Sequence, residues 1–187
     1  MEGGQKTGWF YDHRMNRQRL QAYAPGKRVL DVFSYVGGWG IQAACAGATQ
    51  VTCVDSSSGA IDSVHHNAKI NGLDNIETIE GDAFDALKAL CDEKEKFDIV
   101  VLDPPALIPR RRDQKAGEEA YARLNQLGLR LLDRDGLLVS ASCSMHLSQE
   151  KLTDIIRSSG RKIDRFVQLL EQGHQAPDHP VVPGIPE

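Results

Sequence analysis

The chain has 187 residues, of which 22 are basic and 26 acidic, and 41% of its residues are hydrophobic. This length is typical of one domain with a substantial core, which excludes a disordered chain or a small disulfide scaffold. The longest uninterrupted apolar run, Ile99 to Leu102, is far shorter than the ~18 residues of a membrane helix. We therefore expect a cytoplasmic protein without a membrane partner, and its net charge of −4 argues against indiscriminate nucleic-acid binding.

Apolar runs of strand length alternate with segments of helical period, a pattern typical of parallel strands joined by helices. The sequence predicts an α/β, doubly wound sheet. We expect strands at 28–33, 50–54, 76–80, 97–102 and 136–142, with a sixth at 162–169, and helices at 41–46, 58–71 and 118–132.

Glycines follow the first predicted strand, which contains Asp31 and leads into the segment 33–40. Seventeen residues beyond Gly38 the second strand ends at Asp55, where a carboxylate can accept hydrogen bonds from both hydroxyls of a ribose. The segment 38–43 also fits the loose dinucleotide fingerprint, so a nicotinamide-dependent oxidoreductase is an alternative.

Two more acidic residues, Asp82 and Asp103, follow the third and fourth predicted strands. Carboxyl ends of parallel strands meet at one edge of a doubly wound sheet, where ligands bind. A rim of carboxylates repels a pyrophosphate but attracts the ammonium and sulfonium centres of S-adenosylmethionine. The charge therefore favours this methyl donor, although any one of these aspartates alone could be an ordinary turn or helix-cap residue.

A rigid turn, Asp103-Pro104-Pro105, follows the fourth strand, and Cys143 follows the fifth. Such a turn can hold a substrate base, although Ala106 replaces the aromatic residue that often follows in enzymes that methylate exocyclic amino groups. A thiolate beside the cofactor can add to C6 of a pyrimidine and make C5 nucleophilic. The other cysteines are expected to be inert core residues, and their spacing suggests no metal site.

With these motifs in place, the chain resembles the catalytic domain of the bacterial 23S ribosomal RNA large-subunit methyltransferase I family over nearly its whole length. The resemblance rests on the segments 6–14, 33–38, 54–55, 97–105, 142–144 and 176–180, together with Asp82. It implies a class I S-adenosylmethionine-dependent methyltransferase fold and the formation of 5-methylcytosine. The whole chain would be the catalytic domain, with 1–27 as an N-terminal segment on the cofactor side and 28–187 as the Rossmann-like core.

The resemblance also implies roles for individual residues. Cys143 would be the nucleophile and Asp103 would orient the cytosine, while Pro104 and Pro105 would shape the base pocket. The cofactor would be held by residues from the first four strand ends and the N-terminal segment, namely Arg14, Asp31, Ser34, Tyr35, Gly37, Asp55, Asp82, Ala83 and Asp103.

This chain departs from the family pattern at three places. His13 stands where the family usually has Gln, and Ala106 stands where it commonly has Lys. Met145-His146 stands where a small residue often follows the second serine of the segment 142–144. From the resemblance, we expect the family's RNA-binding domain of the PUA type to lie outside these 187 residues and its last strand to follow Glu187. We therefore expect a six-stranded sheet with an open edge or gap beside the fifth strand, covered by a neighbouring chain in a homodimer.

The sequence thus predicts methyl transfer from S-adenosylmethionine to C5 of a cytosine in large-subunit ribosomal RNA, with S-adenosylhomocysteine as the second product. Two basic clusters, in residues 1–28 and at Arg110, Arg111, Arg112 and Lys115, are candidates for contact with the RNA backbone. One alternative is methylation of a guanine nitrogen, which needs no cysteine after the fifth strand. Another is an RNA-binding module without catalytic activity.

Overall fold

Apolar residues occupy both faces of the central strands, and the computed structural model, which describes residues 11–179, shows what covers each face. Val29, Ile99 and Val101 pack against one set of helices. Their neighbours along the same strands, Leu30 and Val100, pack against another set. Because successive side chains of a strand point to opposite faces, the missing polar alternation follows from a sheet that is covered on both sides.

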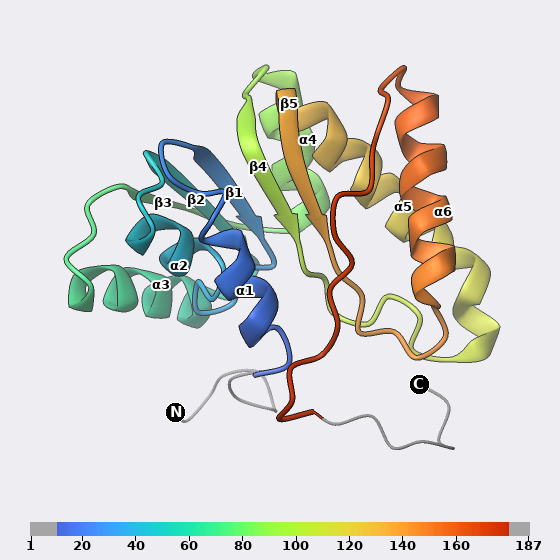
Figure 1. Cartoon of the computed structure of the whole chain (residues 1–187), viewed down its shortest axis with the longest axis horizontal. Coiled ribbons are helices and arrows are strands. Elements are labelled where there is room, and N and C mark those ends of the chain that lie inside the picture. Colours follow the sequence, from blue (N-terminus) through green and yellow to red (C-terminus); the bar gives the residue numbers. More distant parts are fainter. Residues whose placement is uncertain (1–10, 180–187) are drawn as a thin grey trace.

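The sheet has five parallel strands in the order β3-β2-β1-β4-β5, the doubly wound order (Figure 1). The strands are β1 (Arg28–Val32), β2 (Gln50–Asp55), β3 (Ile76–Glu80), β4 (Phe97–Leu102) and β5 (Leu132–Ser140). The helices are α1 (Arg14–Leu20), α2 (Gly40–Cys45), α3 (Ser58–Ile70), α4 (Ala83–Asp92), α5 (Gln114–Leu131) and α6 (Gln149–Lys162), with a short 3-10 helix η1 (Arg111–Asp113).

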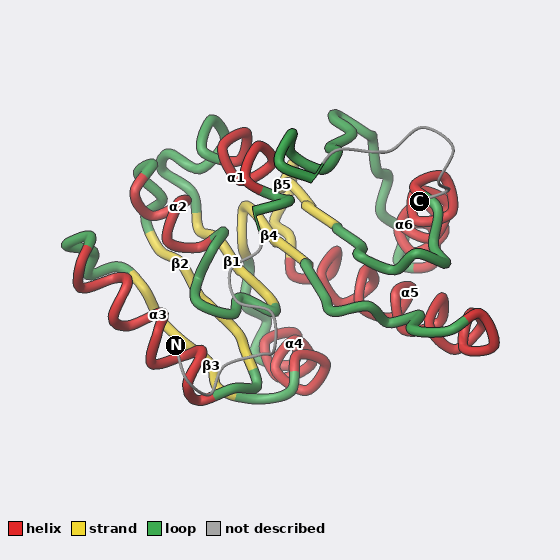
Figure 2. Tube along the Cα trace, turned by 90° about the horizontal axis from the view of Figure 1, so that it is seen from below, coloured by secondary structure: helices red, strands yellow, loops and turns green. Residues whose placement is uncertain are grey.

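Helices α2 and α3 cover one face of the sheet, and α4 and α5 cover the other, an arrangement seen from below in Figure 2. Helix α3 begins where Ser57 Oγ accepts a hydrogen bond from the Ala60 amide, a typical N-cap. It buries Ile61, Val64 and Ala68 on one side, as its period predicts. No helix among residues 11–179 is long and apolar enough to cross a membrane.

The predicted sixth strand at 162–169 is wrong, because α6 continues through Lys162. The helix then ends in a turn in which the Ile163 and Arg165 amides both donate to the Gly160 carbonyl, while Asp164 adopts a φ of 54°. The following residues have no strand beside them, and Phe166 is 88% exposed. Within residues 11–179 the sheet therefore ends at β5, and the open edge predicted beside this strand is present.

Strand β5 begins four residues earlier than predicted, at Leu132 directly after α5. Leu132 pairs with Phe97 and Leu137 pairs with Ile99, so the residues between them form a bulge. Asp133, Arg134 and Asp135 are exposed and charged, a pattern typical of a connection, so the sequence does not indicate that the strand begins before them. The predicted bounds of β3 and β4 are confirmed.

The segment after α6 runs past β5 and returns to α1 (Figure 1). There the Ala176 amide donates a 2.8 Å hydrogen bond to the Asp12 carbonyl, and Tyr23 Oη donates to Glu171 Oε1 at 2.7 Å. These contacts place the residues just before α1 at the carboxyl edge of the sheet, beside the ends of β1 and β4.

Candidate active site

The sheet brings the predicted carboxylates to one edge. Main-chain hydrogen bonds extend the ladders past the strand ends: the Ser34 amide donates to the Val54 carbonyl, and the Asp103 amide donates to the Val32 carbonyl. The loops that carry Ser34, Asp55 and Asp103 are therefore adjacent. Asp82 lies further out, at the end of β3, where its carboxylate caps α4 by accepting from the amides of Phe84 and Asp85.

The loop after β1 is bent by left-handed backbone at three positions, Phe33 (φ 64°), Tyr35 (φ 50°) and Gly37 (φ 83°). Such φ values are uncommon in residues other than glycine and often occur at ligand sites. A Cβ at Gly37 would lie 2.9 Å from Ile41 Cγ1, so this position needs glycine for two reasons. The bends aim the Tyr35 amide at Asp55 Oδ2, at 2.8 Å.

Asp31 lies within β1, is fully buried, and accepts a 2.8 Å hydrogen bond from the Gly40 amide at Oδ2. Burial raises the pKa of its carboxyl to about 7; the Gly40 hydrogen bond opposes this shift, and the charges of Asp103 and Asp55 add to it. Its Oδ1 and the buried Ser34 Oγ have no hydrogen-bond partner among the described residues. Two orphaned polar atoms beside a bent loop fit a ligand that brings hydrogen-bond donors.

The predicted residues divide into a buried group and an accessible group. Asp31, Ser34, Gly37, Ala83 and Pro104 are buried. Tyr35 and Asp55 are half-buried, as is Asp103, and Asp82, Pro105 and Cys143 are exposed. The accessible residues lie in the loops that follow β1 to β5 or at the ends of these strands. Arg14 is exposed and forms an ion pair with Asp178 at 3.4 Å, so in this structure its guanidinium faces the C-terminal segment.

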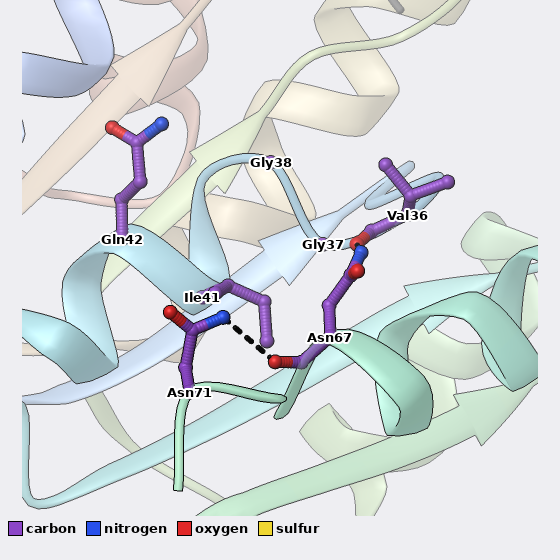
Figure 3. Close-up of a pocket in the computed structure, with 7 residues that line it drawn as sticks. All are labelled: Val36, Gly37, Gly38, Ile41, Gln42, Asn67 and Asn71. Carbon is purple, nitrogen blue, oxygen red and sulfur yellow. Dashed lines mark hydrogen bonds between the residues drawn. The ribbon is translucent and has the colours of Figure 1, made fainter. Parts of the chain in front are cut away.

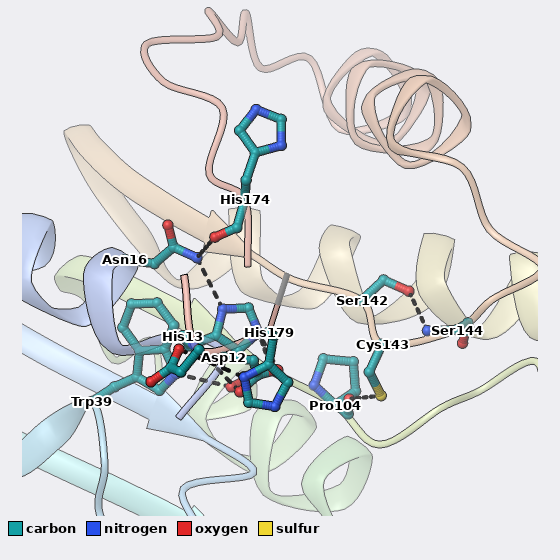
Figure 4. Close-up of polar contacts among 12 residues, drawn as sticks. Asp12, His13, Asn16, Trp39, Pro104, Ser142, Cys143, Ser144, His174 and His179 are labelled. Atoms are coloured by element: carbon teal, nitrogen blue, oxygen red, sulfur yellow. Dashed lines mark hydrogen bonds and ion pairs between the residues drawn. The ribbon is translucent and has the colours of Figure 1, made fainter. Parts of the chain in front are cut away.

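Cys143 lies three residues beyond β5, opposite the turn that follows β4 (Figure 4). Its Sγ donates a 3.8 Å hydrogen bond to the Pro104 carbonyl. Partial desolvation, reinforced by the charges of Asp103 and Asp12, raises the pKa of this thiol. Without substrate, the group is therefore a thiol at neutral pH.

A hydrogen-bonded cluster that sequence reasoning missed holds the loop on both sides of Cys143. The hydroxyl of Tyr121, which is fully buried in α5, lies 2.8 Å from Ser142 Oγ and 3.0 Å from Ser144 Oγ. Ser144 Oγ also accepts from the Ile108 amide at 3.2 Å, which ties this loop to the segment after Pro105. The order serine-cysteine-serine is visible in the sequence, but nothing in the sequence indicates that Tyr121 of α5 contacts both serines.

Trp39, His13 and Arg17 also reach this edge. Trp39 Nε1 donates to Asp103 Oδ2 at 2.9 Å, and His13 Nε2 lies 3.5 Å from Asp103 Oδ1. Burial lowers the pKa of the Arg17 guanidinium, and the surrounding aspartates, Asp12 and Asp103 first, oppose this shift. Arg17 therefore brings positive charge to a rim that is otherwise acidic.

Two cavities border this region. One, of about 310 Å³, lies behind the loop after β1 and is lined by Val36, Gly37, Gly38, Ile41, Gln42, Asn67 and Asn71 (Figure 3). There Asn67 Nδ2 donates to the Val36 carbonyl at 2.8 Å, so α3 supports the loop from behind. The other, of about 510 Å³, is lined by Arg111, Gln114, Met145, His146, Ser148 and Lys151, and begins two residues from Cys143.

Solved structures share this fold. The chain superposes on SMU.776, described as a methyltransferase and solved in complex with SAH, with a TM-score of 0.84 and 25% identity, covering 96% of this chain and 47% of that one. A protein of Streptococcus mutans described as a SAM-dependent methyltransferase gives a TM-score of 0.73 with 27% identity, covering 83% of this chain and 41% of that one. The fold is therefore that of S-adenosylmethionine-dependent methyltransferases, as the sequence predicted.

Sequence relatives agree with this class. Ribosomal RNA large subunit methyltransferase I of Klebsiella pneumoniae is 38% identical over 189 residues, which cover 100% of this chain and 47% of the relative. The Escherichia coli protein of the same name is 36% identical and is covered to 48%. The chain thus spans about half the length of the curated relatives it matches.

A family profile described as conserved hypothetical protein 95 matches residues 17–155. The chain belongs to this family, and the resemblance to large-subunit methyltransferase I is confirmed by the relatives of that name. The segments 6–10 and 180 of the resembling motifs lie outside the described residues.

Proposed function

We propose that this chain is the catalytic part of a methyltransferase that acts on C5 of a cytosine in large-subunit ribosomal RNA, through a covalent bond to Cys143. The observation that carries the proposal is the placement of the exposed Cys143 thiol against the turn Asp103-Pro104-Pro105, at the ends of neighbouring strands. The names of the relatives support the ribosomal RNA substrate, and such a substrate places the reaction in the cytoplasm.

The cofactor is S-adenosylmethionine, which supplies an electrophilic methyl group on a sulfonium centre. The site fits it through the bent loop 33–37, the orphaned Asp31 Oδ1 and Ser34 Oγ, and the acidic rim. Asp55 is placed to accept hydrogen bonds from ribose hydroxyls, although each of its oxygens already accepts one from a main-chain amide, those of Tyr35 and Ser57. Asp82 and Ala83 lie at the outer end, where the adenine would be bound.

In the proposed reaction, the Cys143 sulfur releases its proton to solvent and forms a bond to C6 of the cytosine. The electron pair of the C5–C6 double bond then makes C5 nucleophilic, while Asp103 holds the ring by a hydrogen bond at N3 or N4. C5 takes the methyl group, and the methyl-sulfur bond breaks to leave S-adenosylhomocysteine. Loss of the C5 proton to solvent restores the double bond, breaks the bond between C6 and sulfur, and releases Cys143 as a thiolate.

The cavity beside Cys143 is a candidate binding site for the RNA that flanks the target base. Arg111 and Lys151 line it, and Met145, which is 78% exposed, lies at its edge. Lys151 forms an ion pair with Glu118 at 3.0 Å, and Arg110 and Arg112 both pair with Asp113. Of the basic cluster 110–115, Arg111 is the residue that lines the cavity. A phosphate of the target strand is the group we expect there.

The test is to incubate the chain with labelled S-adenosylmethionine and unmodified large-subunit RNA and to identify the methylated nucleoside after digestion. We expect 5-methylcytosine from the wild type and none from Cys143→Ala, with Cys45→Ala, an exposed cysteine of α2, as the matched control. Methylguanine, or full activity of Cys143→Ala, would contradict the proposal. The first of these results would favour the guanine-nitrogen alternative.

A further inference from the structure

His13 lies in the described part of the chain at a place where the family usually has another residue. It is half-buried, 20% exposed at the side chain, just before α1. Its ring is 5.6 Å from the Trp39 ring at a tilt of 46°, and its Nε2 faces Asp103 Oδ1 at 3.5 Å and Asp12 Oδ2 at 3.8 Å. The imidazole therefore lies against the proposed base-binding carboxylate of Asp103 and against two further residues, Trp39 and Asp12.

The other ring nitrogen of His13, Nδ1, faces the side chain of Asn16, whose amide orientation can be deduced from a second contact. Asn16 Nδ2 lies 3.1 Å from His13 Nδ1 and 3.2 Å from the His174 carbonyl oxygen (Figure 4). A carbonyl oxygen only accepts hydrogen bonds, so the side of Asn16 that faces it must be the NH₂ group. A flipped amide would place an oxygen against that carbonyl, which is unfavourable.

This polarity determines the tautomer of the histidine. The NH₂ group of Asn16 has two hydrogens: one is donated to the His174 carbonyl, and the other points at His13 Nδ1. Nδ1 must then accept and carry no proton, so the proton of the neutral ring is on Nε2. This nitrogen lies near two carboxylates, 3.5 Å from Asp103 Oδ1 and 3.8 Å from Asp12 Oδ2.

Asp103 consequently has a donor group near each of its oxygens. Trp39 Nε1–H donates to Oδ2 at 2.9 Å, and His13 Nε2 lies 3.5 Å from Oδ1. Two donors from different elements restrict rotation of the carboxylate, and each oxygen keeps a lone pair for a substrate amino or imino group. The C-terminal segment takes part, because the His174 carbonyl sets the orientation of Asn16.

We propose that His13, in the Nε2–H tautomer selected by Asn16, is a positioning residue that orients Asp103 toward the cytosine. The inference rests on the proposed function, because it assigns Asp103 a substrate to orient. It requires only a hydrogen-bond donor at position 13, and glutamine, the usual family residue, also supplies one.

The tautomer is tested first, without any substrate. In the ¹⁵N spectrum of the imidazole side chains, assigned with His13→Gln, we expect a protonated Nε2 and an unprotonated Nδ1 for His13 at pH 8. Asn16→Ala should shift this signal toward a mixture of tautomers, whereas the exposed His66 of α3 should keep its signal. A protonated Nδ1 in the wild type would refute the inference, whatever reaction the chain catalyses.

Kinetics then test the role of the donor. We expect His13→Ala to lower kcat by about 10- to 100-fold, the loss of one hydrogen bond to a charged group, with little change in the KM for S-adenosylmethionine. His13→Gln should recover most of the lost rate, and the control His66→Gln should equal the wild type. A glutamine variant as slow as the alanine variant, or a fully active alanine variant, would refute the inference. Absence of cytosine methylation by the wild type would instead refute the proposed function.

Discussion

The indole of Trp39 and the carboxylate of Asp103 are joined by a 2.9 Å hydrogen bond between residues 64 positions apart in the sequence. Trp39 directly precedes α2, and Asp103 directly follows β4. The bond connects the loop proposed to hold the cofactor with the turn proposed to hold the base. Because Trp39 is only 4% exposed, its position is fixed by the core that surrounds it.

Trp39→Phe keeps an aromatic ring but removes the donor to Asp103. We expect kcat to fall by about tenfold or more, and stability by about 1–3 kcal/mol, because the smaller ring also leaves a void. Denaturant unfolding separates the two effects, since the kinetic loss should remain under conditions where the variant is fully folded. Unchanged kcat in the folded variant would show that the Trp39–Asp103 bond has no part in catalysis.

Asp31→Asn should change how stability depends on pH. The folded pKa of Asp31, about 7, is above the ordinary value of 3.8, so the folded state keeps a proton that the unfolded chain loses in this range. The free energy of unfolding of the wild type should therefore fall as pH rises from about 4 to about 7, by up to ~4 kcal/mol. The variant has no such group and should be the more stable protein at pH 8.

Urea unfolding at pH 5 and pH 8 measures this difference, with Asp62→Asn on the exposed side of α3 as the control. Parallel pH dependence in the wild type and in Asp31→Asn would mean that Asp31 is ionised throughout this range. Loss of S-adenosylmethionine affinity in Asp31→Asn would further support contact between this carboxylate and the cofactor.

Tyr121→Phe removes the hydroxyl that lies between Ser142 and Ser144. We expect a loss of about 1 kcal/mol in stability, and slower methyl transfer because Cys143 lies between these two serines. Tyr23→Phe removes a hydroxyl of α1's C-terminal flank that bonds to Glu171 on the exposed surface, and is the matched control. If both variants methylate RNA at the wild-type rate, the cluster around Tyr121 does not position the thiol.

Arg111→Ala should weaken RNA binding without changing the methylated base. Loss of one phosphate contact should reduce the slope of the logarithm of the binding constant against the logarithm of salt concentration by about 0.7. Binding titrations between 50 and 200 mM salt, roughly the range in which such contacts are resolved, measure the slope. Arg134→Ala, in a fully exposed arginine at the start of β5, should keep the wild-type slope. An unchanged slope in Arg111→Ala would place the RNA elsewhere.

Local patterns predicted much of the fold. The strand 97–102 was visible as an apolar run between charged residues, and the order of strands and helices implied a parallel sheet. The placement of Asp55 and Asp103 at one edge followed from that sheet. Local composition was misleading at 162–169. This segment has a strand-like composition, but among the described residues it has no neighbouring strand with which to pair.

The contacts of the site were less predictable because they join distant segments. Nothing near Asp103 in the sequence indicates that Trp39 bonds to one of its oxygens and that His13 lies near the other, and the orientation of Asn16 depends on a main-chain carbonyl 158 residues away. Cys45, expected in the core, is exposed, because the end of α2 faces solvent.

The bond between Cys143 and C6 of cytosine is the step on which the proposed mechanism depends. RNA containing 5-fluorocytidine traps it, because fluorine replaces the C5 hydrogen and cannot be lost as a cation after methyl transfer, so the adduct persists. With S-adenosylmethionine present, intact mass should show one covalent RNA-protein complex, and digestion should locate the linkage at Cys143. A free protein mass, or a linkage at another residue, would contradict the cysteine mechanism.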